Sequence, residues 1–203
     1  MAERGEEEVA AEVNLVSRRV TAYRLLADCF YPPDKNLLEK LRGAGEWNEA
    51  RFSSLVQCFE REEGIESLAV DAAKLFIGPF ELLAPPYGSV YLDNSRVVMG
   101  ESTIDAEKLY INEGLNLELK ETPDHITVEL EFLSYLNFRQ LEALKAADME
   151  SADGYRNKQQ AFLNDHLGRW VFQFTKKVKD FSRTEFYKSV AVLTDEFIKE
   201  DIG

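Results

Sequence analysis

The central helix of this protein is predicted from residues 122–138, which read TPDHITVELEFLSYLNF. Thr122 is suited to cap a helix, Pro123 to occupy its first position, and Asp124 to meet the positive end of the helix dipole. Behind this start, apolar side chains cover more than one face of a helix. A helix that is apolar nearly all round is buried, so we expect this one to be the spine of the fold.

Helical patterns flank this segment on both sides, and Gly and Pro punctuate them. The predicted helices cover residues 7–30, Asp34 to Gly43, a segment around Phe52–Phe59, a segment around Leu68–Phe76, Ser102 or Thr103 to Gly114, a long segment carrying Leu163 to Phe181, and a last segment capped at Ser182 or Thr184. A brief alternation of apolar and polar residues at 115–120 is too short and isolated to argue for a sheet.

We therefore predict an all-α protein, an irregular globular multi-helix bundle. Its length allows one sizeable core, so residues 1–203 are expected to form a single domain. Two lobes, 1–114 and 123–203, would be joined by a hinge near residues 115–122. Such a hinge makes a domain-swapped dimer conceivable beside a monomer.

The formal charge of −13 argues against nucleic acid and anionic membranes as partners. The negative charge favours cationic partners. Alternatively, it only keeps the protein soluble. The first residues are acidic where a secretory signal would be basic, and no segment approaches the roughly 20 apolar residues of a membrane span. We expect a cytoplasmic protein without an integral membrane segment.

No motif of enzyme or cofactor chemistry is present. The two cysteines and two histidines lack the spacing of metal ligands, so no metal site is predicted. Phosphate-loop, dinucleotide-binding and hydrolase motifs are absent, so no catalytic residue and no bound cofactor are assigned, although nucleotide binding stays open. The least supported alternative is an enzyme that uses His125 as a general base, because His125 has no recognisable nucleophile or metal partner.

A proline-tyrosine loop interrupts the helical pattern at residues 82–92, LLAPPYGSVYL. Its adjacent prolines hold the backbone extended, while Tyr87 and Tyr91 offer amphipathic contact area. The loop is either a stiffened connector whose tyrosines cover the core or a contact surface.

The pair Asp124–His125 leaves a similar choice. The helix dipole would favour a charged Asp124 and disfavour an imidazolium at His125, so a neutral imidazole would be available as donor and acceptor. Alternatively, Asp124 assists capping while His125 bonds a loop carbonyl.

Taken together, these motifs resemble the TorD/DmsD family of redox-enzyme (molybdoenzyme) maturation chaperones. The resemblance covers most of the chain from about Tyr23 and rests on their order and spacing. The matching segments are Leu75-Phe76-Ile77-Gly78-Pro79, Ala84-Pro85-Pro86-Tyr87-Gly88-Ser89-Val90-Tyr91, Pro123-Asp124-His125-Ile126 with Glu129-Leu130-x-Phe132-Leu133, Phe162-x-x-x-His166-Leu167-x-x-Trp170-x-x-x-Phe174 and Phe186-Tyr187-x-x-x-Ala191-x-Leu193.

The resemblance implies a cytoplasmic chaperone, not an enzyme. It would bind a molybdopterin oxidoreductase through the twin-arginine leader of that enzyme, its apo form, or both. It would hold the enzyme for cofactor insertion before export. The cargo, not the chaperone, would carry the molybdopterin. The residues that would bind the leader are Pro86, Tyr87, Ser89, Tyr91, Asp124 and His125. Alternatively, such a chaperone serves a molybdoenzyme subunit through a segment other than a twin-arginine leader.

One residue departs from the family pattern. Where this chain has Gly88, the family's loop often has an acidic residue after the aromatic one. The departure removes one contact to a leader arginine. A twin-arginine leader presents two guanidinium groups followed by an apolar run, so its receptor is expected to combine carboxylates with an aromatic groove.

Overall fold

The computed structural model describes residues 2–45, 49–61, 64–78, 81–93, 99–115 and 121–202. Within these residues the protein is all-α, as predicted, and its regular elements are all helices. In chain order these are α1 (Ala2–Phe30), α2 (Lys35–Gly45), α3 (Glu49–Arg61), α4 (Ile65–Ala72), the π-helix η1 (Ala73–Ile77), α5 (Ser89–Leu92), α6 (Glu101–Asn112), α7 (Ile126–Lys145), α8 (Met149–Asp165), the 3-10 helix η2 (Leu167–Arg169), α9 (Val171–Phe181) and α10 (Glu185–Ile202).

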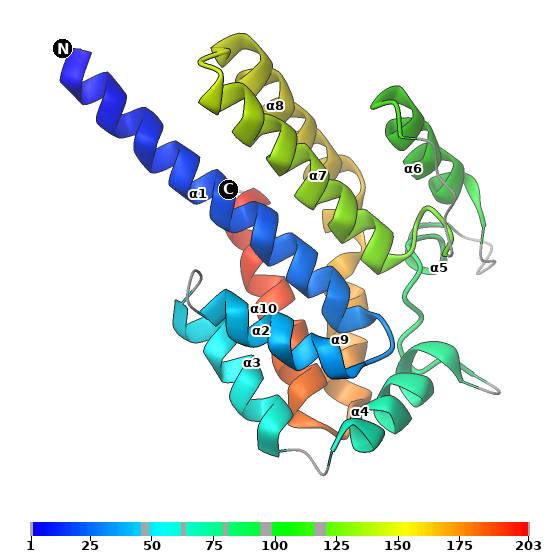
Figure 1. Cartoon of the computed structure of the whole chain (residues 1–203). Helices are drawn as coiled ribbons and strands as arrows, with labels where there is room; N and C mark the ends of the chain where they lie inside the picture. The colour runs from blue at the N-terminus through cyan, green and yellow to red at the C-terminus, as the bar shows by residue number, and fades with distance from the viewer. Residues whose placement is uncertain are drawn as a thin grey trace.

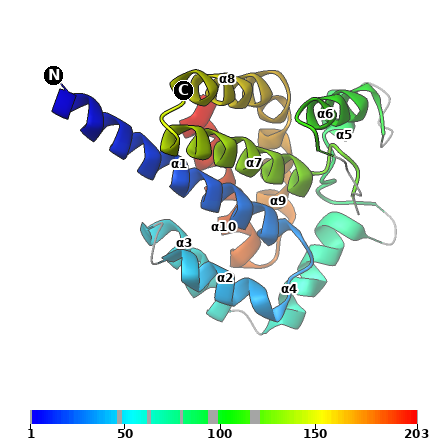
Figure 2. The same ribbon diagram turned by 45° about the horizontal axis from the view of Figure 1, so that its top comes forward.

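Helix α7 is the spine of the fold, as its sequence predicts. It packs along α1 on one side and α8 on the other, and the three helices lie side by side in both views (Figures 1 and 2). Fourteen of its residues are buried. Below this layer, α9 and α10 pack together, and α10 also contacts α3. One large core joins these elements, with Trp170, Phe174 and Phe186 fully buried in it.

The helix ends near the N-terminus follow from local chemistry. Helix α1 ends at Phe30 as predicted but begins at Ala2 instead of residue 7. Asp34 caps α2, because its Oδ1 accepts the backbone N–H groups of Asn36 and Leu37, each at 2.9 Å. Helix α2 continues to Gly45, two residues past the predicted end at Gly43.

The long helix predicted from Leu163 to Phe181 is wrong. The chain leaves the helical conformation at His166 (φ −130°, ψ −87°) and restarts as α9 at Val171. Gly168 makes the break possible, since a Cβ there would lie 2.4 Å from the carbonyl oxygen of Leu163. The apolar residues keep helical spacing across the break because α8 and α9 both bury their apolar faces in the same core.

Two further boundaries differ from prediction around the proline-tyrosine loop. The loop contains one helical turn, α5, that its sequence does not predict. Helix α6 begins at Glu101 behind Gly100 with no side-chain cap, so Ser102 and Thr103 lie inside the helix. The Ser102 hydroxyl instead donates to the Asp93 carboxylate at 3.0 Å and ties α6 to the end of the loop.

The predicted hinge near residues 115–122 lies largely outside the described residues, which end at 115 and resume at 121. The division into lobes 1–114 and 123–203 stays a prediction. Any exchange of lobes between copies would have to exchange the contacts of α1 with α7. None of the described helices is both long enough and apolar enough to cross a membrane.

Candidate functional site

The proline-tyrosine loop is fixed by backbone pairing to the turn before α7. The Gly88 N–H donates to the carbonyl oxygen of Asp124 at 2.8 Å, and the Ile126 N–H donates to that of Pro86 at 2.9 Å. Tyr87 and His125 thus form an isolated antiparallel bridge. We name this paired unit, residues 84–92 and 122–126, the aromatic wall. It brings together all six residues predicted to bind a leader.

Asp124 is fully buried within the wall. Its Oδ2 accepts the backbone N–H of Ser89 at 2.9 Å and so anchors the start of α5. Its Oδ1 has no hydrogen-bond partner in the described part of the chain, nor has the buried hydroxyl of Ser89. The prediction that Asp124 lies in the first turn of α7 is wrong, because the helix begins at Ile126 and Asp124 lies in the turn before it.

His125, not Thr122, caps α7. Its Nδ1 accepts the Thr127 N–H at 3.2 Å and lies 2.7 Å from the Thr127 hydroxyl. Burial lowers the pKa of His125 to about 4 although Asp124 opposes the shift, so the imidazole is neutral near pH 7. The ring meets that of Tyr87 edge-on, with centroids 5.2 Å apart. The imidazole thus supports the wall through capping and packing.

The tyrosines of the wall differ in how they are held. The Tyr91 hydroxyl donates to the carbonyl oxygen of Pro85 at 2.9 Å, and its ring stacks on Trp170 at 5.6 Å. Tyr87 is half-buried, and burial together with nearby carboxylates raises the pKa of its hydroxyl. Pro86, by contrast, is buried. Of the six residues predicted to bind a leader, only Tyr87 and Tyr91 are therefore partly exposed, and the other four are buried.

A buried polar cluster that the sequence does not reveal supports the wall from beneath. The Glu129 carboxylate is fully buried and bonds His166 Nε2 at 2.9 Å and Trp170 Nε1 at 3.1 Å. Burial raises the pKa of Glu129, partly offset by His166 and Trp170. Burial alone would lower the pKa of His166, but the Glu129 carboxylate outweighs it and raises that pKa. The partners are 37 and 41 positions away, so only the resemblance, which includes all three residues, could have pointed to them.

This cluster explains Gly88. A Cβ at position 88 would lie 3.1 Å from Trp170 Nε1 and 3.3 Å from Glu129 Oε1. Any side chain at position 88 would therefore begin in tight contact with Trp170 and Glu129, and these neighbours would have to move. The chain keeps glycine because the loop packs directly on Trp170.

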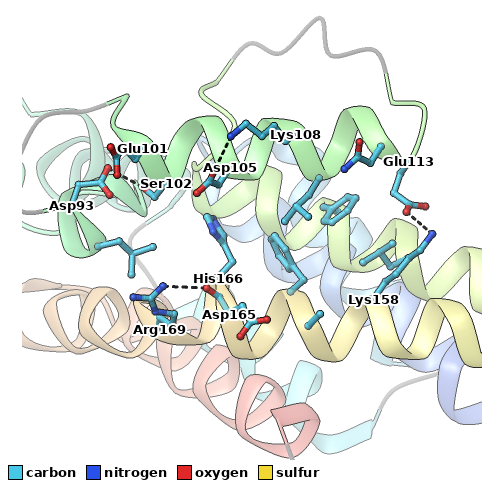
Figure 3. Close-up of a pocket in the computed structure, with 17 residues that line it drawn as sticks. Asp93, Glu101, Ser102, Asp105, Lys108, Glu113, Lys158, Asp165, His166 and Arg169 are labelled. Atoms are coloured by element: carbon cyan, nitrogen blue, oxygen red, sulfur yellow. Dashed lines mark hydrogen bonds and ion pairs between the residues drawn. The ribbon is translucent and has the colours of Figure 1, made fainter.

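A groove of about 760 Å³ begins where the wall ends. Helix α6 forms one side of it and α8 the other (Figure 3). We name it the α6–α8 groove. Its floor is apolar and its rim is charged: Leu92, Leu109, Phe132, Leu136, Ala161 and Phe162 are apolar, Asp93, Glu101, Asp105, Glu113 and Asp165 are acidic, Lys108, Lys158 and Arg169 are basic, and Ser102, Asn112 and His166 complete it. A volume of this size suits a small ligand or a short peptide segment.

The described residues contain no group of three or more His, Cys, Asp or Glu side chains placed to hold a metal ion. The groove and wall instead offer aromatic, apolar and carboxylate surfaces, which suit the binding of a polypeptide.

Comparison with known proteins supports this assignment to binding. A family model described as "Nitrate reductase delta subunit" matches residues 43–176. The chaperone protein TorD of Vibrio parahaemolyticus is 34% identical over 79% of this chain and 77% of its own length. A Haemophilus influenzae protein assigned as the Tat proofreading chaperone DmsD is 28% identical over 87% of this chain and 86% of its own.

A solved structure from Archaeoglobus fulgidus, assigned to redox enzyme maturation, shares the fold. Its TM-score is 0.63 with 26% identity, over 89% of this chain and 93% of that one. Fold and relatives define a chaperone of redox-enzyme maturation. The chain belongs to the TorD/DmsD family of system-specific chaperones for molybdoenzyme maturation.

Proposed function

We propose that this chaperone acts in the cytoplasm by binding the twin-arginine leader of an apo molybdopterin oxidoreductase and holding the enzyme for cofactor insertion before export. The observation that carries the proposal is the aromatic wall, which holds half-buried Tyr87 and Tyr91 and whose last residue, Leu92, also lines the α6–α8 groove. A fixed wall costs little ordering on binding, so its tyrosines supply contact area at low entropic cost.

In this proposal the six residues have different tasks. Tyr87 and Tyr91 touch the leader, since tyrosine rings can cover apolar side chains or stack on a guanidinium. Pro86, Ser89, Asp124 and His125 hold them in place through backbone pairing, the Asp124–Ser89 bond and the cap on α7. The chaperone itself carries no cofactor and catalyses no reaction.

An ordering leader loses conformational entropy, so we expect an affinity on the order of micromolar, which permits release. Calorimetry with the twin-arginine leader peptides of molybdopterin oxidoreductases from the same organism tests the proposal. Tyr87→Ala should weaken binding several-fold because it removes an aromatic contact. The matched control is Phe181→Ala at the end of α9, an exposed aromatic residue outside the wall and the groove lining, which should leave the affinity unchanged.

The second candidate is a chaperone for a segment other than the leader. It stays within the same family and uses the same surfaces for the body of the apo enzyme. Affinity capture from cells, repeated with cargo that lacks its leader, separates the two. Cargo that is retained equally without its leader would replace the first candidate by the second.

Light scattering of the purified chain distinguishes a monomer from a domain-swapped dimer.

A further inference from the structure

The charge pattern of the α6–α8 groove leads to a more specific inference, which rests on the proposed function. We propose that the arginine pair of the leader is bound by carboxylates at the α5 end of this groove. The apolar run of the same leader then lies along the groove floor, toward the ion pair of Glu113 and Lys158.

The aromatic wall itself offers no accessible carboxylate for an arginine. Asp124 is 0% exposed, and its Oδ2 already accepts the Ser89 N–H. Position 88 is glycine and is packed against Trp170. A guanidinium that stacks on the tyrosines must therefore find its counter-charge outside the wall. Glu121 lies near Tyr87, and the groove rim, which begins at Leu92 and Asp93, offers several carboxylates.

The α5 end of the groove is rich in acid. Asp93, Glu101, Asp105 and Asp165 lie there, against the cations Lys108 and Arg169. Lys108 is occupied by Asp105 at 2.9 Å, and Arg169 donates to the backbone oxygen of Asp165 at 3.4 Å, not to its carboxylate.

Asp93 accepts the Ser102 hydroxyl at 3.0 Å. The two carboxylates at this end without a bond to a described residue come from opposite sides. Glu101 opens α6 and Asp165 ends α8; both are exposed, and neither has an ion-pair partner among the residues that the structure describes (Figure 3). Two separate carboxylates on facing sides match two adjacent guanidinium groups, because each arginine can take its own charge-assisted pair.

The other end of the groove is neutral. The Lys158 ammonium bonds the Glu113 carboxylate at 2.6 Å and links α8 to the end of α6. Between the ends lies the apolar floor with Phe132 and Phe162, whose rings meet edge-on at 5.1 Å. The groove is thus acidic at one end, apolar in the middle and neutral at the other end.

A twin-arginine leader has the complementary polarity: two basic residues followed by an apolar, helix-forming run. Helix α6 has twelve residues, Glu101–Asn112, and is about 18 Å long, so it can lie alongside a helical segment of about the same number of residues. Only one orientation places the arginines at the acidic end. Binding in the reverse direction would set them beside the closed ion pair, where no carboxylate is available.

Calorimetry with a twin-arginine leader peptide that binds the wild-type chain tests the carboxylates. The double variant Glu101→Gln/Asp165→Asn should weaken binding roughly three- to tenfold, as expected for two partly exposed pairs. The double variant Glu39→Gln/Glu66→Gln changes the net charge equally on exposed faces of α2 and α4 and should bind like the wild type. A leader whose two arginines are replaced by glutamine should bind the groove variant and the wild type with the same affinity.

A second experiment tests the direction of the leader. A spin label at the amino end of the peptide should broaden the NMR signals of the chaperone's amides near Glu101 and Asp165. A label at the carboxyl end of the peptide should broaden the amide signals near Glu113 and Lys158. Ala161→Trp, at an exposed position of the lining, should fill the floor and weaken binding without loss of folding.

The outcomes separate the two proposals. A wild-type chain that binds no leader overturns both. A leader that binds the wild type, loses affinity in Tyr87→Ala, and ignores both groove variants overturns the groove assignment alone. The reverse broadening pattern overturns the direction. If Ala161→Trp changes the oligomeric state in light scattering but not the leader affinity, the groove is an interface between copies of the chain.

Discussion

The aromatic wall and the α6–α8 groove adjoin each other but are held by different means. Backbone hydrogen bonds, a helix cap and buried polar partners fix the wall, whereas the Glu113–Lys158 ion pair and a few anchors hold α6 beside the groove. The chief anchor is Tyr110, which is buried, donates to the carbonyl oxygen of Pro123 at 2.8 Å and packs on Phe132. If the leader binds as proposed, the preorganised wall would supply shape complementarity and the charged groove the electrostatic attraction.

The largest effect is expected from the support of the wall. Glu129→Ala would leave His166 and Trp170 Nε1 buried without their partner, so the free energy of unfolding should fall by about 3–5 kcal/mol. Glu131→Ala is the matched control on the same helix. Glu131 pairs with Arg24 at 3.1 Å near the surface, so its loss should cost within about 1 kcal/mol. Chemical denaturation measures both, and equal losses would show that the buried cluster does not support the wall.

The second effect is a loss of stability in mild acid. The folded chain holds His125 with a pKa of about 4 instead of 6.5, so the unfolded chain binds more protons between these values. Stability should therefore fall as the pH falls from about 6.5 to 4, by about 3 kcal/mol in all. The raised pKa of His166 has the opposite effect on stability. Protonated His166 stabilises the folded chain at low pH, and this stabilisation is lost as the pH rises through the pKa of His166 in the folded chain.

A variant isolates the contribution of His125. His125→Asn retains an N-cap but does not titrate, so its denaturation curves should lack this part of the acid loss. A wild type and a variant that lose stability in parallel between pH 6.5 and 4 would assign the acid sensitivity to other groups.

Next in size is the effect of a side chain at Gly88. Gly88→Ala should destabilise by about 1–3 kcal/mol, because the methyl group presses on Trp170 and Glu129. Gly43→Ala is the control: it lies inside α2 with no atom within 4 Å of the added Cβ, and should stabilise by about 0.5–1 kcal/mol. Thermal unfolding compares the two. Gly88→Asp should likewise weaken the wall; a gain in leader affinity from it would contradict the packing argument.

The smallest effect concerns salt. If the groove supplies exposed charges, the leader affinity should fall roughly two- to fivefold between low and moderate ionic strength, since screening shortens the range of surface electrostatics. The salt dependence should shrink in Glu101→Gln/Asp165→Asn and persist in Tyr87→Ala. Calorimetry at several salt concentrations checks both slopes. A slope that disappears with Tyr87 instead would place the charged contact at the wall.

Much of the helical architecture could be predicted from the sequence. Periodic apolar residues and Pro–Gly boundaries predict the end of α1 at Phe30, the cap at Asp34 and the burial of α7. These signals are local, so they can be recognised without knowing the fold. The predictions failed at the break around His166, whose ring bonds Glu129 of another helix, and at the start of α7, where the Ile126 N–H donates to the carbonyl oxygen of Pro86 in the loop.

The candidate site shows the same limit. Its wall residues were predicted as a set, but the task of Asp124 was not, because its bond to Ser89 crosses 35 positions. Glu129 reads in the sequence as an ordinary acidic neighbour of Glu131. Its burial against His166 and Trp170 depends on how α7, α8 and α9 pack.

The all-α class, the central helix, the acidic character of the chain and the proline-tyrosine loop can all be recognised in the sequence alone. These follow from composition, periodicity and backbone restrictions, which act over a few residues. Which carboxylates are buried and which are available to a partner depends on the tertiary structure. Asp124 and Glu129 lose their solvent, and Glu101 and Asp165 keep theirs, because burial is set by the packing of helices far apart in the chain.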